Sequence, residues 1–295
     1  MEFRTDLALE LREDLRELPR GVSCEEEKRG KAKITRIKIS TAAGAKVFRK
    51  PVGSYVTVEL PPFSDYVDDE NQFAPLIAEE LRSFLPQEGM ATVVGLGNDE
   101  ITPDAIGPLT AGKILVTRHL HGEFARACGI DSFRSVAAVI PGVLGQTGID
   151  AAELIKCVVQ SLRPACLIAV DALAARSLSR LGNTVQISDA GLSPGSGVSN
   201  ARPQLSYETM GIPVISVGVP TVVDGATLAA CLSISEEDEQ FEEFRRLLEP
   251  RGAKMMVTPR EIDLLVQRAA KMVALAVNCA LQKDLSAEEI LMLQS

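Results

Sequence analysis

From Ala91 onward, short apolar runs alternate with segments of helical spacing, and this alternation restricts the possible folds more than any other feature of the chain. The apolar runs are Thr92–Leu96, Val136–Ile140, Cys166–Val170, Thr184–Ile187 and Pro213–Val217. Helices are expected between them, over about residues 104–119, 151–162 and 172–181. Continuous apolar strands that alternate with helices predict a mostly parallel sheet with right-handed crossovers and helices on both faces. The expected fold class is α/β, with a three-layer α/β/α core.

The first 90 residues have a different pattern. They are rich in charged side chains and contain two runs of half-exposed strand type, residues 34–39 and 55–60, followed by a predicted helix over 73–84. We expect a smaller N-terminal α+β region, residues 7–90, packed on a core of residues 91–295. A long last helix is predicted over 259–282, because Thr258–Glu261 has the pattern of a capping box with proline at the first helical position.

Charge and composition exclude several classes of protein. The net charge of -9 and the sequence pI near 5.0 do not fit a protein that binds nucleic acid directly. The six cysteines include no C-x-x-C pair and no signal peptide is recognised, so we expect reduced thiols in a cytoplasmic protein. No apolar run is interpreted as long enough to cross a membrane. The acidic run 235–244 is interpreted as a solvated helix face.

Two polar clusters follow predicted parallel strands, at the sheet edge where α/β proteins bind ligands. Residues 95–108 contain Asp104, and residues 170–177 contain Asp171. Each aspartate alone is expected to cap a helix. Together they could converge, and converging carboxylates can separate their pKa values into a base and an acid that activate water. The same oxygens could instead be two ligands of a divalent metal.

Other catalytic motifs are weak. The Gly95-Leu-Gly97 turn lacks the third glycine of a dinucleotide site, because Glu100 stands in its place. The chain contains neither a P-loop motif nor the G-x-S-x-G motif of serine hydrolases. His119 and His121, the only histidines, lie near a predicted helix end and are interpreted as structural.

Two non-enzymatic classes stay open beside hydrolysis. Residues 95–98 precede a predicted helix and could bind a small anion, although Asp99, Glu100 and Asp104 oppose a negative ligand. The chain could also be a purely structural protein. Cleavage of a protein substrate that depends on both Asp104 and Asp171 would exclude both alternatives.

A series of long motifs, in order along the chain, resembles the germination proteases of endospore-forming bacteria. They are RTDLA at residues 4–8, GLGN and TPDAIGP, LVTRHL, PGVLGQTGID, AVDALAARS, QISDAG, PGSGV, GIPVISVGVPTVVD and MVTPREID. The resemblance implies an endopeptidase of the spore core that starts the degradation of small acid-soluble, DNA-protecting spore proteins during germination. It also implies a homotetramer, made as an inactive zymogen that processes itself.

The resemblance also assigns roles to residues. Self-processing is implied between Asp6 and Leu7, which makes residues 1–6 a short propeptide. Asp104 and Asp171 correspond to the proposed catalytic pair. The family is similar in fold to the hydrogenase-maturation endopeptidases, of phosphorylase/hydrolase-like fold, in which two such acids hold a metal. No cofactor is firmly implied, and a divalent metal is the open alternative. Ser193 stands where the family usually has histidine.

The Gly/Ser-rich segment Ile187–Asn200 is interpreted as a wall of the substrate cleft, at the same carboxyl edge of the sheet as Asp171. Gly195 and Gly197 are expected to let the substrate backbone approach closely, and Asn98 is expected to line the same cleft. Two further acids, Asp189 and Asp224, are expected to hydrogen-bond loops rather than to catalyse.

Overall fold

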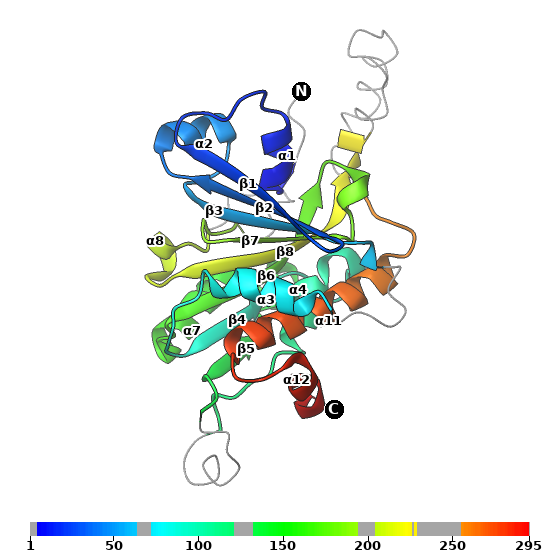
Figure 1. Cartoon of the computed structure of the whole chain (residues 1–295). Coiled ribbons are helices and arrows are strands. Elements are labelled where there is room, and N and C mark those ends of the chain that lie inside the picture. The colour runs from blue at the N-terminus through cyan, green and yellow to red at the C-terminus, as the bar shows by residue number, and fades with distance from the viewer. Residues whose placement is uncertain are drawn as a thin grey trace.

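A single mixed sheet forms the centre of the molecule (Figure 1). The computed structural model describes residues 5–63, 72–120, 132–193, 204–225, 227–228 and 255–294. Within these residues the strand order is β1-β2-β3-β7-β8-β6-β4-β5, with β9 paired to β8. The strands are β1 Val22–Arg29, β2 Ala32–Ile39, β3 Gly53–Glu59, β4 Ala91–Gly95, β5 Val136–Val139, β6 Cys166–Ala175, β7 Thr184–Ser188, β8 Val214–Asp224 and β9 Met256–Val257.

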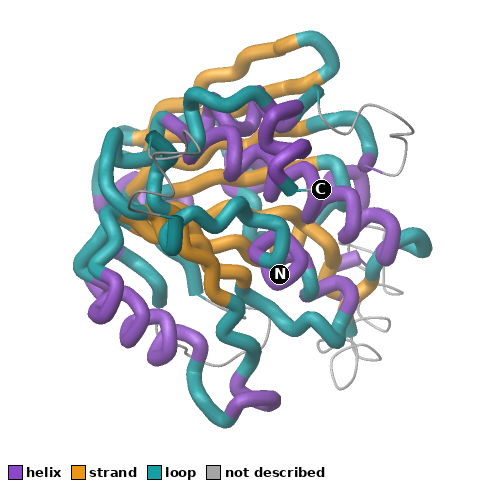
Figure 2. Tube along the Cα trace, turned by 90° about the horizontal axis from the view of Figure 1, so that it is seen from below, coloured by secondary structure: helices purple, strands orange, loops and turns teal. Residues whose placement is uncertain are grey.

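Helices cover both faces of the sheet, which confirms the α/β class and its three layers (Figure 2). The larger cores lie between the sheet and α3, α4 and α11 on one face, and between the sheet and α7 on the other. The α-helices are α1 Ala8–Glu13, α2 Ala42–Phe48, α3 Ala74–Arg82, α4 Ile106–Ala111, α6 Leu144–Thr147, α7 Ala151–Leu162, α8 Tyr207–Met210, α11 Ile262–Leu281 and α12 Ala287–Leu293, and the 3-10 turns are η2 Thr102–Asp104 and η3 Leu178–Arg180.

Parallel pairing is confined to β5, β4, β6 and β8. The strand β7 runs antiparallel to β8, and β3 antiparallel to β7, so the N-terminal strands continue the core sheet. The connection 176–183 between β6 and β7 is shorter than the dozen or more residues that a parallel crossover needs. The short connection explains why β7 runs antiparallel. The alternation of apolar runs in the sequence does not reveal this direction. The division into two domains stays a prediction.

The predicted helix over 172–181 is wrong, because β6 continues through Ala175. Residues 172–175 have high helix propensity, yet they pair with β8 from Ala172↔Val219 to Ala175↔Val223. Hydrogen bonds to a neighbouring strand outweigh a propensity difference of less than about 1 kcal/mol per residue. The helix expected over 104–119 is also shorter than predicted and is reduced to η2 and α4.

The last helix, α11, begins at Ile262, three residues later than expected. Thr258–Glu261 does not form the predicted capping box, since no side chain caps the helix and Pro259 O accepts a turn hydrogen bond from Ile262 N. By length and composition α11 could cross a membrane, which corrects the sequence interpretation. Most of it is buried against the sheet, α3 and α4, as is usual for a core helix.

Glycines allow α4 to lie directly against the end of β4 and the middle of β6. A Cβ atom on Gly107 would be 2.1 Å from Leu96 O and 2.5 Å from Val170 O, and both are backbone atoms that cannot rotate away. Gly97 has φ +112°, and a Cβ there would be 2.0 Å from Asp104 O. The loop after β4 is therefore folded back on the strand ends, which fixes the position of the Asp104 backbone.

We predict that Gly107→Ala lowers the free energy of unfolding by about 1–3 kcal/mol or more, the usual cost of adding an atom where backbone has to move. The measurement is urea unfolding at pH 7. Gly145→Ala is the matched control, because Gly145 lies in α6 and a Cβ atom added there would have no neighbouring atom within 4 Å. Equal stability of the two variants would contradict the close approach of α4.

Candidate active site

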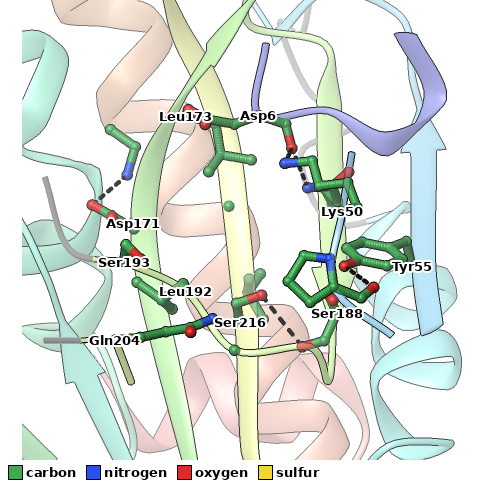
Figure 3. Close-up of a pocket in the computed structure, with 16 residues that line it drawn as sticks. Asp6, Lys50, Tyr55, Asp171, Leu173, Ser188, Leu192, Ser193, Gln204 and Ser216 are labelled. Carbon is green, nitrogen blue, oxygen red and sulfur yellow. Dashed lines mark hydrogen bonds between the residues drawn. The ribbon is translucent and has the colours of Figure 1, made fainter. Parts of the chain in front are cut away.

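A cavity of about 200 Å³ opens on the sheet face opposite α11 (Figure 3). Side chains alternate along a strand, so positions two apart share a face. On β6, Leu167 and Ala169 pack in the α7 core, and Asp171, next on that face, lines the cavity. Gln186 of β7 and Ser216 of β8 line it from the neighbouring strands. The cavity therefore has a polar floor built on paired strands.

Asp171 is the first residue of β6 beyond the reach of β4. Val170 still pairs with Gly95 of β4, whereas Asp171 pairs only with Gly218 of β8. Its Oδ1 accepts a hydrogen bond of 2.9 Å from Ala172 N. The expectation that Asp171 caps a helix is wrong, because it lies inside a strand.

Asp104 ends the 3-10 turn η2, which is held by hydrogen bonds to Pro103 and Asp104. Thr221 Oγ1 of β8 donates to Pro103 O at 2.7 Å, and Asn98 N donates to Asp104 Oδ2 at 2.7 Å. The carboxylate of Asp104 is close enough to Asp171 for its charge to act on it. The structure therefore brings the two predicted acids together, although Asp171 lines the cavity and Asp104 is not among its lining residues.

The pKa of Asp171 is raised well above the ordinary aspartate value. Burial is the largest cause, followed by the negative charge of Asp104, with a smaller contribution from Asp6. The hydrogen bond from Ala172 N acts in the opposite direction. Asp171 is thus suited to keep its proton to higher pH and to serve as the acid of the pair.

The chain's own N-terminal segment forms part of the cavity wall. Asp6 N donates to Ala174 O and Ala174 N donates to Asp6 Oδ2, both at 2.8 Å, so Asp6 lies along the end of β6. Leu7, the next residue, is fully buried. The Asp6–Leu7 peptide bond, singled out by the family resemblance, therefore lies beside the cavity that Asp171 lines.

Glu10 fixes this segment to the sheet from the first turn of α1. It is fully buried, and its carboxylate accepts hydrogen bonds from Arg176 N at 2.7 Å and Ser177 N at 2.9 Å. Arg180 pairs with it at 3.2 Å. Since an isolated buried carboxylate is costly, these donors keep α1 docked.

The role of the Gly/Ser segment as a wall of the substrate cleft stays a prediction, and part of the segment lies beside the cavity. Gly191, Leu192 and Ser193 line the cavity. They do not follow a carboxyl edge shared with Asp171, because β7 is antiparallel and ends opposite Ser216. Gly195 and Gly197 lie outside the described residues.

Asn98 does not line the cavity. Its side-chain Oδ1 accepts hydrogen bonds from Glu100 N at 3.0 Å and from Gln146 Nε2 at 2.9 Å. Its backbone N–H is bonded to the Asp104 carboxylate, which occupies a donor that an anion would use and disfavours anion binding here.

The second-tier acids bond to backbone N–H groups, although not to the loops that were expected, because Ser54 belongs to β3 and Thr227 is helical. Asp189 accepts a hydrogen bond from Ser54 N at 2.6 Å and Asp224 from Thr227 N at 2.9 Å. His119 is exposed in a turn. His121, the acidic run 235–244 and the rest of residues 229–254 lie outside the described residues.

Sequence reasoning missed Lys50 and Gln186, which reach the cavity from the loop after α2 and from β7. Both donate to the carbonyl oxygen of Asp6. No motif marks them, because they lie 44 and 180 residues from Asp6 along the chain. The one available sequence signal was the polar Gln186 inside the apolar run 184–187, where a polar side chain needs a hydrogen-bond partner.

Asp171 lines a cavity together with Asp6 of the chain's own N-terminal segment, and the charge of Asp104 acts on Asp171; this arrangement is suited to peptide-bond hydrolysis, the chemistry of a peptidase. A sequence model of the germination protease family matches residues 4–235. Because this match covers most of the chain, the chain belongs to the germination protease family, a family of hydrolases.

Individual relatives extend the match over nearly the whole chain. Germination proteases of Caldanaerobacter subterraneus and Clostridium perfringens are 42% and 40% identical, covering 98% and 97% of this chain and 97% of each relative. The protease of Priestia megaterium is 36% identical over 97% of this chain and 95% of its own. Among solved structures, the NiFe hydrogenase maturation protease HycI from Thermococcus kodakarensis KOD1 matches with TM-score 0.37 and 16% identity, over 67% of this chain and 98% of its own.

We predict that Asp171→Asn stabilises the fold above the ordinary aspartate pKa. Because the pKa of Asp171 is higher in the folded than in the unfolded chain, its ionisation favours unfolding increasingly as the pH rises toward the folded pKa. Asparagine keeps the acceptor for Ala172 N and carries no charge. At pH 7.5 the free energy of unfolding should rise by about 0.5–2 kcal/mol, the usual range for a stabilising substitution.

The measurement is urea unfolding of both proteins at pH 3.5 and pH 7.5. The difference should be near zero at the lower pH. Asp284→Asn, at an exposed position, controls for the change in net charge and should show no such pH dependence. A variant that is less stable than wild type at pH 7.5 would contradict the buried-charge argument.

Proposed function

We propose that the protein is an endopeptidase that starts the degradation of small acid-soluble spore proteins during germination, with Asp104 and Asp171 as its catalytic acids. The observation that carries the proposal is the coupling of these acids beside the cavity. Membership of the germination protease family supports a role of this peptidase in spore germination. A spore-core, cytoplasmic location and a homotetramer are part of the proposal.

The chemistry follows from one proton shared by two carboxyl groups. Like charges held close together do not both ionise readily, so one member stays protonated. The ionised member, which we assign to Asp104, takes a proton from a water molecule as that water adds to the peptide carbonyl carbon. Protonated Asp171 then gives its proton to the leaving nitrogen as the carbon–nitrogen bond breaks.

Processing of a zymogen between Asp6 and Leu7 is the second part of the proposal. Asp6 lines the same cavity as Asp171, and Leu7 is already packed in the folded core. Release of residues 1–6 would free the end of β6, where Asp6 is now bonded to Ala174. A substrate peptide would then have access to the same backbone groups.

A divalent metal held by Asp104 and Asp171 is the alternative to a metal-free pair. Zinc sites normally use three or more protein ligands, and within the described residues no group of three or more His, Cys, Asp or Glu side chains is arranged to hold a metal. Two carboxylates fit only an ion such as Mg²⁺, which keeps most of its water ligands. Such an ion would act as a Lewis acid on the carbonyl oxygen.

We predict that the full-length protein cleaves a purified small acid-soluble spore protein, and that Asp104→Asn and Asp171→Asn each lower kcat by about 10²–10⁴-fold, the usual contribution of a general acid or base. Cleavage is followed by mass spectrometry, which also reports loss of residues 1–6. Asp99→Asn is the matched control, since Asp99 is exposed on the loop before Asp104. It should cleave like wild type.

The same assay with a strong chelator separates the two mechanisms. Unchanged cleavage supports the metal-free pair, whereas loss that added Mg²⁺ or another divalent ion restores makes the two aspartates metal ligands. Retained cleavage in both Asn variants would contradict the site assignment. A wild-type protein that cleaves neither itself nor the spore protein would contradict the proposed function.

A further inference from the structure

We propose that Lys50 and Gln186 bind the carbonyl oxygen of the peptide bond that is hydrolysed and stabilise the negative charge that develops on it. This inference rests on the proposed function, because it assigns a role within the same cavity. It applies to Asp6–Leu7 in self-processing and to the corresponding bond of a protein substrate.

The first argument is the convergence of two donors on one oxygen (Figure 3). Lys50 Nζ lies 3.0 Å and Gln186 Nε2 lies 2.9 Å from Asp6 O. These distances lie within the range that donors of an oxyanion hole adopt, about 2.7–3.1 Å. A carbonyl oxygen has two lone pairs, and at Asp6 O both are used by side-chain donors that come from two distant segments of the chain.

The second argument is that the Gln186 amide is held in one orientation. Its Oε1 accepts a hydrogen bond of 2.7 Å from Ala8 N, which leaves Nε2 directed at Asp6 O. One side chain therefore contacts the backbone on both sides of the Asp6–Leu7 bond, as a neighbouring strand would contact a bound peptide. Gln186 is 7% exposed and lies on the central strand β7, so its position is rigid.

The third argument is the positive charge of Lys50 beside this carbonyl oxygen. Within the part of the chain that the structure describes, Lys50 forms no salt bridge, and its Nζ donates to Asp6 O. Burial lowers its pKa, and the charge of Asp6 partly opposes this. A cation without a carboxylate partner in a desolvated wall favours negative charge nearby more strongly than it would in water.

The fourth argument is the position of the acids relative to these donors. Asp171 lines one side of the cavity, and Asp6 and Lys50 lie on the other (Figure 3). The cavity between them is large and polar enough to hold water. Water in this space could thus approach the carbonyl carbon while Lys50 and Gln186 hold its oxygen.

Hydrolysis of the peptide bond proceeds through an alkoxide intermediate. Water adds to the carbonyl carbon and loses one proton to the ionised aspartate, and the C=O electron pair becomes an alkoxide held by Lys50 and Gln186. When the C=O bond forms again, the carbon–nitrogen bond breaks and the leaving nitrogen takes the proton of the protonated aspartate. The products are a carboxyl group and an amine. Lys50 and Gln186 are not altered chemically.

The test measures kcat and KM of the full-length protein on the spore protein for Lys50→Met and Gln186→Glu. Gln186→Glu keeps the acceptor for Ala8 N and replaces the donor to the carbonyl with a carboxylate oxygen, which does not donate when ionised and repels the developing negative charge. Each variant should lower kcat by about 10²–10³-fold with KM changed less than a few fold, as loss of one oxyanion donor does. Lys50→Arg, which keeps a cationic donor, should recover part of the loss.

Lys46→Met and Gln267→Glu are the matched controls, because both residues are exposed on helices away from the cavity. They should keep wild-type kcat. Thermal unfolding of every variant identifies a loss that comes from misfolding, and in that case Lys50→Ala and Gln186→Met, which also lack the donor, replace the affected variant.

The outcomes separate this proposal from the proposed function. Wild-type kcat in Lys50→Met and Gln186→Glu, with Asp171→Asn inactive, overturns the carbonyl-binding role and leaves the peptidase intact. A rise in KM at constant kcat also overturns it, because the residues would then bind only the ground state. A wild-type protein without cleavage overturns both.

Discussion

The site depends on a difference in length between neighbouring strands. β6 is paired with β4 as far as Val170 and continues along β8 to Ala175. Where β4 stops, the chain turns back through η2, and this places Asp104 beside the first unshared residue of β6, Asp171. Had both strands ended together, Asp171 would have begun a loop. Instead its position is fixed by the hydrogen bonds of a strand, which is the kind of support a preorganised site requires.

Sequence reasoning predicted those features that are determined locally. The apolar runs at 92–96 and 166–170 became strands and the amphipathic run at 151–162 became α7, because period and burial are properties of short segments. The places of Asp104 and Asp171 after two parallel strands left their convergence open, and their pairing came from the family resemblance. The environment of Asp171 differs from the expectation, since Asp171 lies within a strand rather than at the start of a helix.

The features that were missed depend on contacts between distant segments. The extension of β6 needs β8 as a partner, and the direction of β7 depends on the length of a connection. The convergence of Asp6, Lys50 and Gln186 needs three segments to meet on one sheet face. None of these contacts leaves a periodic pattern, and a lone lysine or glutamine carries no sequence signal for a carbonyl partner.

The docking of the N-terminal segment has a consequence for kinetics. Leu7 is fully buried and Glu10 is bonded to the backbone of Arg176 and Ser177, so the Asp6–Leu7 bond is held beside the cavity of its own chain while α1 is docked. If the proposed self-processing uses this cavity, maturation is a first-order process whose half-time does not change on dilution. Protein concentration then sets only the later rate at which substrate is consumed.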